Sequence, residues 1–324
     1  MNAPITPAEL RACLDRYALR VLQQPHALSH GTVSRVSLAQ TQHGPVVVKR
    51  HSGRFEPAQI HLALEAHAHA CAHDLAPPLL TTAEGQRAVL LGPFWYSVTE
   101  YAETVQSAAD DHRVLGRAVA ALHTCLSQFT PTNEGTAGVL QLHQDPIAVL
   151  RRIQADRAAG SQIHDEIDWR VSILQKAGLA AEELAACPRE WVHGDVRSEN
   201  LLAAGSPGRW WFIDFDQISR FPRPYEIVRA FAASFRTSAR IAFARQFAEY
   251  LAAYRDVRPI PAHESAQMID LYITVQAGET RTFTTPEGEV RGMADYARTR
   301  RQLLTWIVKH RDELTAAARQ GADI

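Results

Sequence analysis

The sequence predicts an α+β fold with two lobes: an N-terminal lobe built on an antiparallel sheet and a C-terminal lobe that is mostly helical. Several stretches within residues 27–100 alternate apolar and polar residues, which is typical of half-buried strands. From Asp110 onward most stretches instead carry apolar residues at helical spacing. We place the boundary near residue 102, which gives lobes of residues 1–102 and 103–324.

The N-terminal lobe begins with a predicted helix over residues 6–23. Its first letters, TPAE, are typical of a helix start, because a threonine cap precedes a proline and a glutamate that can bond back to the cap. Residues 27–40 then alternate, and a turn leads into a buried strand at residues 45–50. This pattern predicts a hairpin whose second strand carries Lys49.

A second helix is predicted from Glu56 to about Asp74, with Glu65 inside it, because a Glu-Pro start is followed by apolar residues at helical spacing. Two further strands, residues 87–91 and 95–100, are joined by a Gly-Pro turn. They complete an antiparallel sheet of about five strands.

The second helix also carries several histidines, namely His61, His67, His69 and His73, with Cys71 among them. Residues two apart on a helix point away from each other, so only His69 and His73 share a face. Two ligands alone do not make a closed zinc site. A metal site and a solvated, histidine-rich face both remain open, with the solvated face as the default.

The C-terminal lobe is predicted to be helical over most of its length. His123 lies in one of these helices, and we expect it to have a packing or capping role. The helical segments are residues 114–129, 146–180 (in one or two pieces), 181–186, 225–235, 241–254, 264–275 and 295–318.

The most informative stretch, WVHGDVRSENLLAAGSPGRWWFIDFDQ, covers residues 191–217. A short apolar strand end leads into the turn His-Gly-Asp, and two strands joined by a Gly/Ser/Pro turn follow. Asp195 ends the first turn, Asn200 precedes the two strands, and Asp214 and Asp216 follow them. Mg²⁺ prefers hard oxygen ligands and binds phosphates as well. The stretch therefore predicts a magnesium–nucleotide site.

The spacing from Asp195 to Asn200, and on to Asp214, resembles the catalytic loop and metal-binding aspartate of kinases. His-Gly-Asp and Ile-Asp-Phe-Asp stand where eukaryotic protein kinases have His-Arg-Asp and Asp-Phe-Gly. Both features resemble the aminoglycoside phosphotransferase and choline kinase superfamily. The resemblance implies a bilobal, protein-kinase-like fold whose N-terminal lobe binds the nucleotide. Only residues 191–217 are specific to it.

The resemblance implies that Asp195 is the base that orients and deprotonates a hydroxyl group. Asn200 and Asp214 would bind Mg²⁺, and Asp216 would be either a secondary metal ligand or a strand-end anchor.

Three further residues have supporting roles in this comparison. His193 would brace the loop by hydrogen bonds, and Arg197 would either contact the γ-phosphate or an anionic acceptor, or be solvated. Family members typically have an aspartate at about the position of Glu226, where it braces the catalytic loop through backbone N–H groups. The longer side chain of Glu226 leaves this role open.

On the nucleotide side, the resemblance implies that Lys49 reaches the α and β phosphates and that Glu65 pairs with it. Taken alone, a lysine at a strand end is commonly a solvated charge. It is the order and spacing of Lys49 and Glu65 that favour the nucleotide role.

The same comparison gives Gly31, Thr32 and Ser34 the role of covering the phosphates. With a single glycine, this loop is poorly marked. The backbone near Glu100 and Ala102 would bond the adenine edge.

Composition narrows the class of protein. The 324 residues carry a net charge of −1, so neither a nucleic-acid nor a membrane partner is expected. The four cysteines lack metal or disulfide spacing, which suits a reducing compartment. Neither a signal peptide nor an apolar run long enough to span a bilayer is evident. We expect a soluble, cytoplasmic protein.

The predicted function is transfer of the γ-phosphoryl group of ATP, or of GTP, to a hydroxyl of a small molecule. Two alternatives remain open: a bacterial protein Ser/Thr kinase of the same fold and a non-catalytic nucleotide-binding scaffold. The sequence leaves the acceptor, the nucleotide preference and the oligomeric state open.

Overall fold

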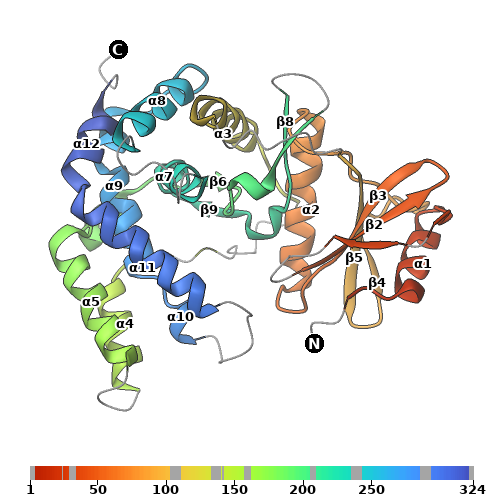
Figure 1. Ribbon diagram of the computed structural model, residues 1–324, viewed down its shortest axis with the longest axis horizontal. Coiled ribbons are helices and arrows are strands. Elements are labelled where there is room, and N and C mark those ends of the chain that lie inside the picture. Colours follow the sequence, from red (N-terminus) through yellow and green to blue (C-terminus); the bar gives the residue numbers. More distant parts are fainter. Residues whose placement is uncertain are drawn as a thin grey trace. The chain divides into compact units, whose positions relative to one another are not determined.

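A computed structural model describes the chain in two compact units, which are considered separately (Figure 1). The described residues are 4–23, 25–28, 34–102, 111–132, 140, 142–156, 162–204, 209–234, 243–284 and 293–320. The first unit comprises Met1–Ser107, Cys125–Gly138 and Glu199–Ile218. The second unit comprises Ala108–Thr124, Val139–Ser198 and Ser219–Ile324. Residues 125–138 and 199–218 thus belong to the first compact unit although they follow residue 102.

The first unit contains the predicted five-stranded antiparallel sheet, with the strand order β1-β2-β3-β5-β4. Its strands are β1 (His26–Leu28), β2 (Arg35–Thr41), β3 (Gly44–Arg50), β4 (Val89–Leu91) and β5 (Phe94–Glu100). β2 and β3 form the predicted hairpin, and Gly44 follows its turn with a φ of 111°, which glycine adopts without a steric penalty. β3 lies between β2 and β5, so the backbone beside Lys49 is fixed on both sides.

Helices α1 (Pro7–Arg16) and α2 (Pro57–Ala72) flank this sheet (Figure 1). Successive residues of a strand point to opposite faces. Val98 of β5 accordingly belongs to the apolar core that includes α1, whereas Trp95 packs against Ile60 of α2. Each helix therefore has its own apolar core against the sheet.

The start of α1 follows the predicted pattern, since Thr6 and Glu9 form a reciprocal capping box. The helix nevertheless ends at Arg16, earlier than predicted. Ala18 adopts a φ of 53°, and this left-handed conformation turns the chain away from the helix axis.

A hairpin and a short 3₁₀ helix from the third segment of the first unit lie against α2. They are β7 (Leu201–Ala203), β8 (Trp210–Phe212) and η3 (Phe215–Gln217). Phe212 N–H donates to Leu75 O at 2.8 Å, just beyond α2. Gln59 Nε2, at the start of α2, donates to Asp216 O at 3.0 Å. These bonds fix the segment that carries the two predicted acidic residues.

The second unit is mostly helical, as predicted, and its described strands β6 (Glu190–Val192) and β9 (Ser219–Phe221) pair with each other. Its helices are most of α3 (His112–Leu126), α4 (Pro146–Ala155), α5 (Gln162–Ala177), α6 (Ala181–Ala186), α7 (Arg223–Ser234), α8 (Phe243–Arg255), α9 (Ala262–Ala277), α10 (Arg281–Thr284), α11 (Met293–Lys309) and α12 (Arg311–Arg319). Phe231 of α7 packs against Phe247 and Tyr250 of α8. A Cβ at Gly116 of α3 would lie 2.3 Å from Tyr250 O of α8, so α3 and α8 approach this closely only because residue 116 is glycine.

The segment predicted to be helical at residues 295–318 forms two helices, α11 and α12, which meet at His310. His310 has a φ of −107° and a ψ of 20°, outside the helical range, and begins α12 as its N-cap.

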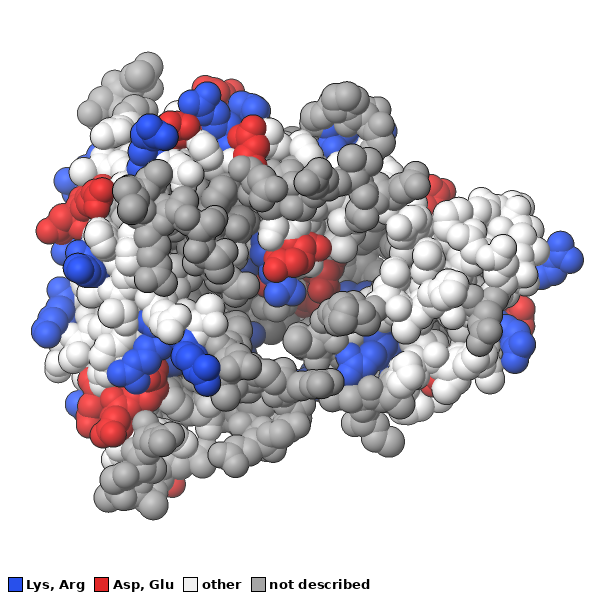
Figure 2. Space-filling view, in the orientation of Figure 1, with Lys and Arg blue, Asp and Glu red and all other residues white. Residues whose placement is uncertain are grey.

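Surface charge follows the near-neutral composition, since acidic and basic side chains are interspersed on the face in Figure 2. Across the described ranges, no helix combines the length and the apolar character needed to cross a membrane.

Candidate active site

Lys49 lies near the end of β3, and its side chain is mostly buried. Its Nζ lies 2.7 Å from Asp214 Oδ1 and 2.8 Å from Asp216 Oδ1. Burial alone would lower the pKa of Lys49, but the two carboxylates raise it above its ordinary value of 10.5. Lys49 is therefore a fixed positive charge held between two carboxylates of the same unit.

Asp214 follows β8 in the left-handed backbone conformation, with φ 67° and ψ 61°. A residue other than glycine is held there at a cost of about 1–3 kcal/mol, so the surrounding contacts must fix it. This turn leads from β8 into η3 and lets both Asp214 and Asp216 reach Lys49. The Asp214 side chain is 38% exposed, which leaves its carboxylate accessible to a ligand.

Asp216 is more deeply buried and more completely bonded. Ser34 Oγ donates to Asp216 Oδ2 at 3.1 Å, and His51 Nδ1 lies 3.5 Å from Oδ1. Burial would raise the pKa of Asp216, but Lys49 and His51 hold it well below its ordinary value of 3.8. Both carboxylate oxygens of Asp216 therefore have partners, and its role as anchor or metal ligand stays a prediction.

Asn200 lies at the same end of the hairpin as Asp214. It is buried, ends the 3₁₀ helix η2 (Ser198–Asn200), and its carbonyl accepts the N–H of Ile213 at 3.0 Å. This hydrogen bond between Ile213 and Asn200 therefore extends the β7–β8 ladder.

These donors fit a magnesium ion. The amide oxygen of Asn200 and the exposed carboxylate of Asp214 are hard oxygen ligands. The cluster also places two carboxylates against the single ammonium of Lys49, which leaves an excess of negative charge for a cation.

Asp195 belongs to the second unit and is buried. Arg229 Nη2, on α7, donates to Asp195 Oδ1 at 2.6 Å, and Arg197 Nη2 lies 3.3 Å from Oδ2. Burial would raise the pKa of Asp195, but first Arg229 and then Arg197 hold it below its ordinary value of 3.8. Asp195 is therefore anionic at neutral pH.

The loop that carries Asp195 is anchored by Glu226. Glu226 Oε2 accepts the N–H of His193 at 2.9 Å, and Oε1 accepts the N–H of Gly194 at 2.5 Å. Asp195 N–H donates to His193 Nδ1 at 3.3 Å. Glu226 thus makes the loop-bracing contacts although its side chain is one methylene longer than the aspartate typical of the family.

His123 completes this buried network within the second unit. Its Nε2 lies 2.9 Å from Glu226 Oε2 and its Nδ1 lies 2.8 Å from the hydroxyl of Tyr254. Burial lowers the pKa of His123, against the opposing effect of Glu226, so the imidazole is neutral at pH 7. His123 therefore holds Glu226 in place.

The expected ion pair of Lys49 and Glu65 is not formed within the described residues. Lys49 is satisfied by the two aspartates, and Glu65 accepts bonds from the N–H and the hydroxyl of Thr132. The prediction was wrong about this contact, since each residue has other partners.

The remaining nucleotide-side residues stay predictions. Gly31 and Thr32 lie outside the described residues, and Ser34 donates to Asp216. Glu100 N–H donates to Pro78 O, away from β3. The carbonyl of a strand residue points to the same side as its N–H, so the Glu100 carbonyl also faces away from β3. Ala102, two residues on, is buried.

The solvated histidine face expected on α2 is only partly correct. His61 and His73 are exposed, but His67 is buried: its Nε2 lies 2.8 Å from Pro77 O and its ring contacts Phe215. His69 is half-buried. Helical spacing alone predicted that His67 would face water, but its buried imidazole has the carbonyl of Pro77 as a hydrogen-bond partner.

A comparison with protein-family models decides the family. The model described as "Phosphotransferase enzyme family" matches residues 26–260. The chain belongs to this family. It is therefore a kinase-like phosphotransferase, as the catalytic-loop motif predicted.

Three solved structures are similar to this member of the phosphotransferase enzyme family. An aminoglycoside phosphotransferase from Alicyclobacillus acidocaldarius subsp. acidocaldarius DSM 446 is 19% identical, with a TM-score of 0.62, covering 100% of this chain and 98% of its own. An amicoumacin kinase in complex with AMP-PNP and Ca²⁺ is 14% identical, with a TM-score of 0.64 and coverage of 93% and 96%. A microcompartment-associated aminopropanol kinase is 17% identical, with a TM-score of 0.56 and coverage of 98% and 97%. At these identities the likeness shows the fold, and it confirms the predicted kinase-like fold class.

No match is found among curated protein sequences.

Arg229 is the residue at Asp195 that the motif did not reveal. It lies three residues after Glu226, so both side chains project from α7 on nearly the same side. Once Glu226 is assigned to the catalytic loop, this helical spacing is a signal that could have identified Arg229.

Proposed function

We propose that the protein transfers the γ-phosphoryl group of ATP, or of GTP, to a hydroxyl group of a small molecule. The observation that carries the proposal is the lysine held between two aspartates at the end of the β7–β8 hairpin, in a chain of the phosphotransferase family. Phosphoryl transfer needs a positive charge and metal-binding oxygens at the phosphates. Two structural relatives, an amicoumacin kinase in complex with AMP-PNP and an aminopropanol kinase, support a nucleotide donor and a small acceptor.

Lys49 would neutralise charge on the phosphates, and its position is set by its two carboxylate partners. Asn200 and Asp214 would hold Mg²⁺, which when bound offsets the charge that develops on the phosphate oxygens. Asp216 would fix Lys49 and η3, because Ser34 and Gln59 already bind it.

Asp195 would orient the acceptor hydroxyl and take its proton. A carboxyl whose pKa is held low is a weak base. In a loose phosphoryl-transfer transition state the proton leaves late, so positioning contributes most of the effect. The bonds from Glu226 to the loop and from Arg229 to the carboxylate supply this positioning.

The test is a screen of hydroxyl acceptors, such as amino alcohols, sugars and aminoglycosides, with labelled ATP or GTP, followed by Asp195→Asn. We expect transfer to a small molecule and a loss of several orders of magnitude in kcat with nucleotide binding retained. Asp168→Asn, an exposed carboxylate on α5, is the matched control. Wild-type turnover by Asp195→Asn would refute the role of Asp195.

The same screen separates the alternatives. A cell lysate incubated with labelled nucleotide would carry label in polypeptides if the acceptor were a protein. Binding of nucleotide without transfer to any acceptor would instead support a scaffold.

A further inference from the structure

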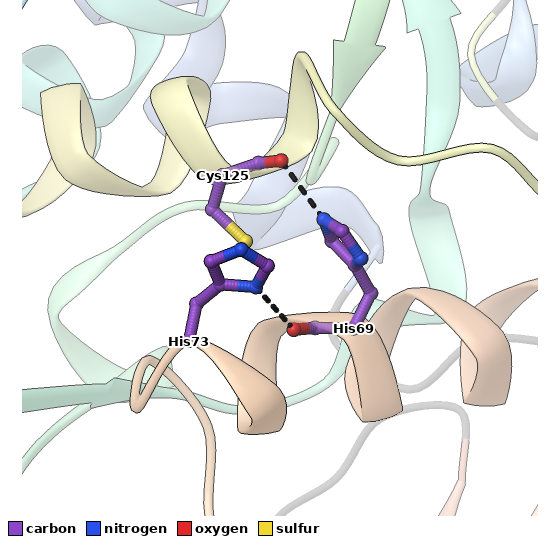
Figure 3. Close-up of side chains that lie close together, drawn as sticks. All are labelled: His69, His73 and Cys125. Carbon is purple, nitrogen blue, oxygen red and sulfur yellow. Dashed lines mark hydrogen bonds between the residues drawn. The ribbon is translucent and has the colours of Figure 1, made fainter.

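Three side chains able to bind a metal come together at the C-terminal end of α2. His69 lies in the last turn of α2, His73 ends that helix as its C-cap, and Cys125 belongs to the same compact unit (Figure 3). One ring nitrogen of each histidine and the sulfur of Cys125 lie within 4.8 Å of one another. We propose that His69, His73 and Cys125 bind Zn²⁺ or a similar divalent transition-metal ion. None of the three has a role in the proposed phosphoryl transfer.

The imidazole of His73 is oriented as a metal ligand requires. His73 Nδ1 lies 2.9 Å from the carbonyl oxygen of His69 (Figure 3). A carbonyl can only accept a hydrogen bond, so Nδ1 carries a proton, and in the neutral ring Nε2 has the lone pair. Metal-binding histidines in proteins are commonly held in this way, with the second ring nitrogen bonded to a backbone carbonyl.

His69 is anchored by the same kind of bond. Its Nε2 lies 2.9 Å from the carbonyl oxygen of Cys125, and its ring also packs against Phe129. The carbonyl assigns the proton to Nε2 and leaves the lone pair on Nδ1. In its neutral form, each imidazole would therefore have one N–H bonded to a carbonyl and one nitrogen with a lone pair, which is the form that binds metals.

The sulfur of Cys125 supplies a third, softer donor, and Figure 3 shows it beside the ring of His73. Burial raises the pKa of Cys125 to about 11, so the residue is a thiol at neutral pH. Two nitrogens and one sulfur suit Zn²⁺ or Co²⁺ and disfavour Mg²⁺, which prefers oxygen. The donor set therefore differs in kind from the oxygen ligands near Lys49.

Closing the site requires the donor atoms to move closer together. Zinc–nitrogen and zinc–sulfur bonds of about 2.0–2.3 Å in a tetrahedron place the donor atoms about 3.3–3.7 Å apart. Donors that already lie within 4.8 Å must approach by roughly an ångström. His73 is exposed and His69 is half-buried, so their side chains have room to adjust. A water molecule would fill the fourth position, as in other sites with three protein ligands.

Binding would release one proton. The S–H bond of Cys125 breaks, a sulfur–metal bond forms, and the proton passes to solvent. Because the thiol must lose its proton to bind the ion, the apparent affinity should rise with pH. The ion would join the end of α2 to Cys125, so occupancy should also raise the melting temperature.

The test uses Co²⁺, whose thiolate complexes absorb light through sulfur-to-metal charge transfer. The full-length protein is titrated with Co²⁺ in the presence of excess Mg²⁺, and Zn²⁺ is then added in competition. We expect a charge-transfer band that saturates at one ion per chain, disappears when Zn²⁺ is added, and grows at higher pH.

His73→Ala and Cys125→Ser should abolish the band, whereas Cys71→Ser and His61→Ala, which change the same residue types on α2, should leave it unchanged. His73 is exposed, so His73→Ala is expected to fold normally and remains informative if the buried Cys125→Ser does not. Absence of the band in the wild type, or its persistence in folded His73→Ala, would overturn the proposal. Neither result bears on phosphoryl transfer, which is measured separately.

Discussion

Replacing Glu226 by glutamine tests how the catalytic loop is held. The carboxylate is fully buried, and its two oxygens accept the N–H groups of His193 and Gly194 and the Nε2–H of His123. Glutamine has nearly the same size but only one acceptor oxygen. Its NH₂ group must therefore face at least one N–H donor, where the carboxylate made a hydrogen bond.

The magnitude follows from these contacts. The best placement keeps the amide oxygen at the position shared by His193 and His123, and leaves the N–H of Gly194 opposite the NH₂ group. One buried donor left unpaired costs about 1–3 kcal/mol, and the opposing amide adds a similar amount. We expect Glu226→Gln to lower the free energy of unfolding by about 2–6 kcal/mol.

The catalytic effect should be larger than the effect on nucleotide binding. A misplacement of about 1 Å costs about 10²-fold in rate, so kcat should fall by about that factor. The KM for nucleotide should change little, because Lys49 and Asp214 belong to the other compact unit. Urea denaturation and steady-state kinetics measure both effects.

Glu313→Gln, an exposed carboxylate at the start of α12, is the control and should have neither effect. Glu226→Asp keeps both acceptor oxygens and should lose less of both stability and rate than Glu226→Gln. A glutamine variant with wild-type stability and kcat would refute the bracing role.

Two further predictions concern pH. Arg229 is the largest influence that lowers the pKa of Asp195, so Arg229→Gln should move the acid limb of the kcat/KM profile to higher pH. The control Arg245→Gln, at an exposed position on α8, should leave the profile unchanged. Equal profiles for Arg229→Gln and the wild type would contradict the assignment. The folded-state pKa of His123 lies below its ordinary 6.5, and that of Glu226 lies below its ordinary 4.5. As the pH drops, both residues therefore bind protons in the unfolded chain before they do so in the folded protein. Stability should fall below about pH 6.5 because of His123, and again below about pH 4.5 because of Glu226. Urea denaturation at pH 7 and 5.5 should show a smaller decrease in His123→Asn than in the wild type, and an equal decrease would exclude His123 as the source.

Elements with local signals were predictable from sequence. The hairpin of β2 and β3, the Gly-Pro connection before β5 and the capping box at Thr6 each depend on neighbouring residues, and each forms as predicted. Where a boundary depends on backbone conformation without such a signal, the prediction failed. The left-handed Ala18 that ends α1 and the break at His310 are two examples.

For the candidate site, the sequence identified residue types better than partners. Motif spacing singled out Lys49, Asp195, Asn200 and Asp214, but the choice of partner for a charged group is made by the folded chain. Lys49 pairs with the aspartates of the β8–η3 turn and not with Glu65, and Gln59 of α2 binds the backbone of the same turn.

The same reason explains the two groups that sequence reasoning missed. Arg229 reaches Asp195 across the second unit, and Cys125 meets His69 and His73 from a segment distant in sequence. Neither contact has a local pattern. Cys71, which is close in sequence to the histidines, is not part of the group of three.

The magnesium–nucleotide site is tested most directly by thermal stabilisation with MgATP, MgGTP and ADP. The wild type is compared with Asp214→Ala and with the control Asp15→Ala, which changes an exposed aspartate on α1. A ligand that binds only the folded protein stabilises it by about 2.7 kcal/mol at 100 times its Kd. We predict a magnesium-dependent rise in Tm that Asp15→Ala retains and Asp214→Ala loses. No rise with any nucleotide, or an equal rise in Asp214→Ala, would contradict it.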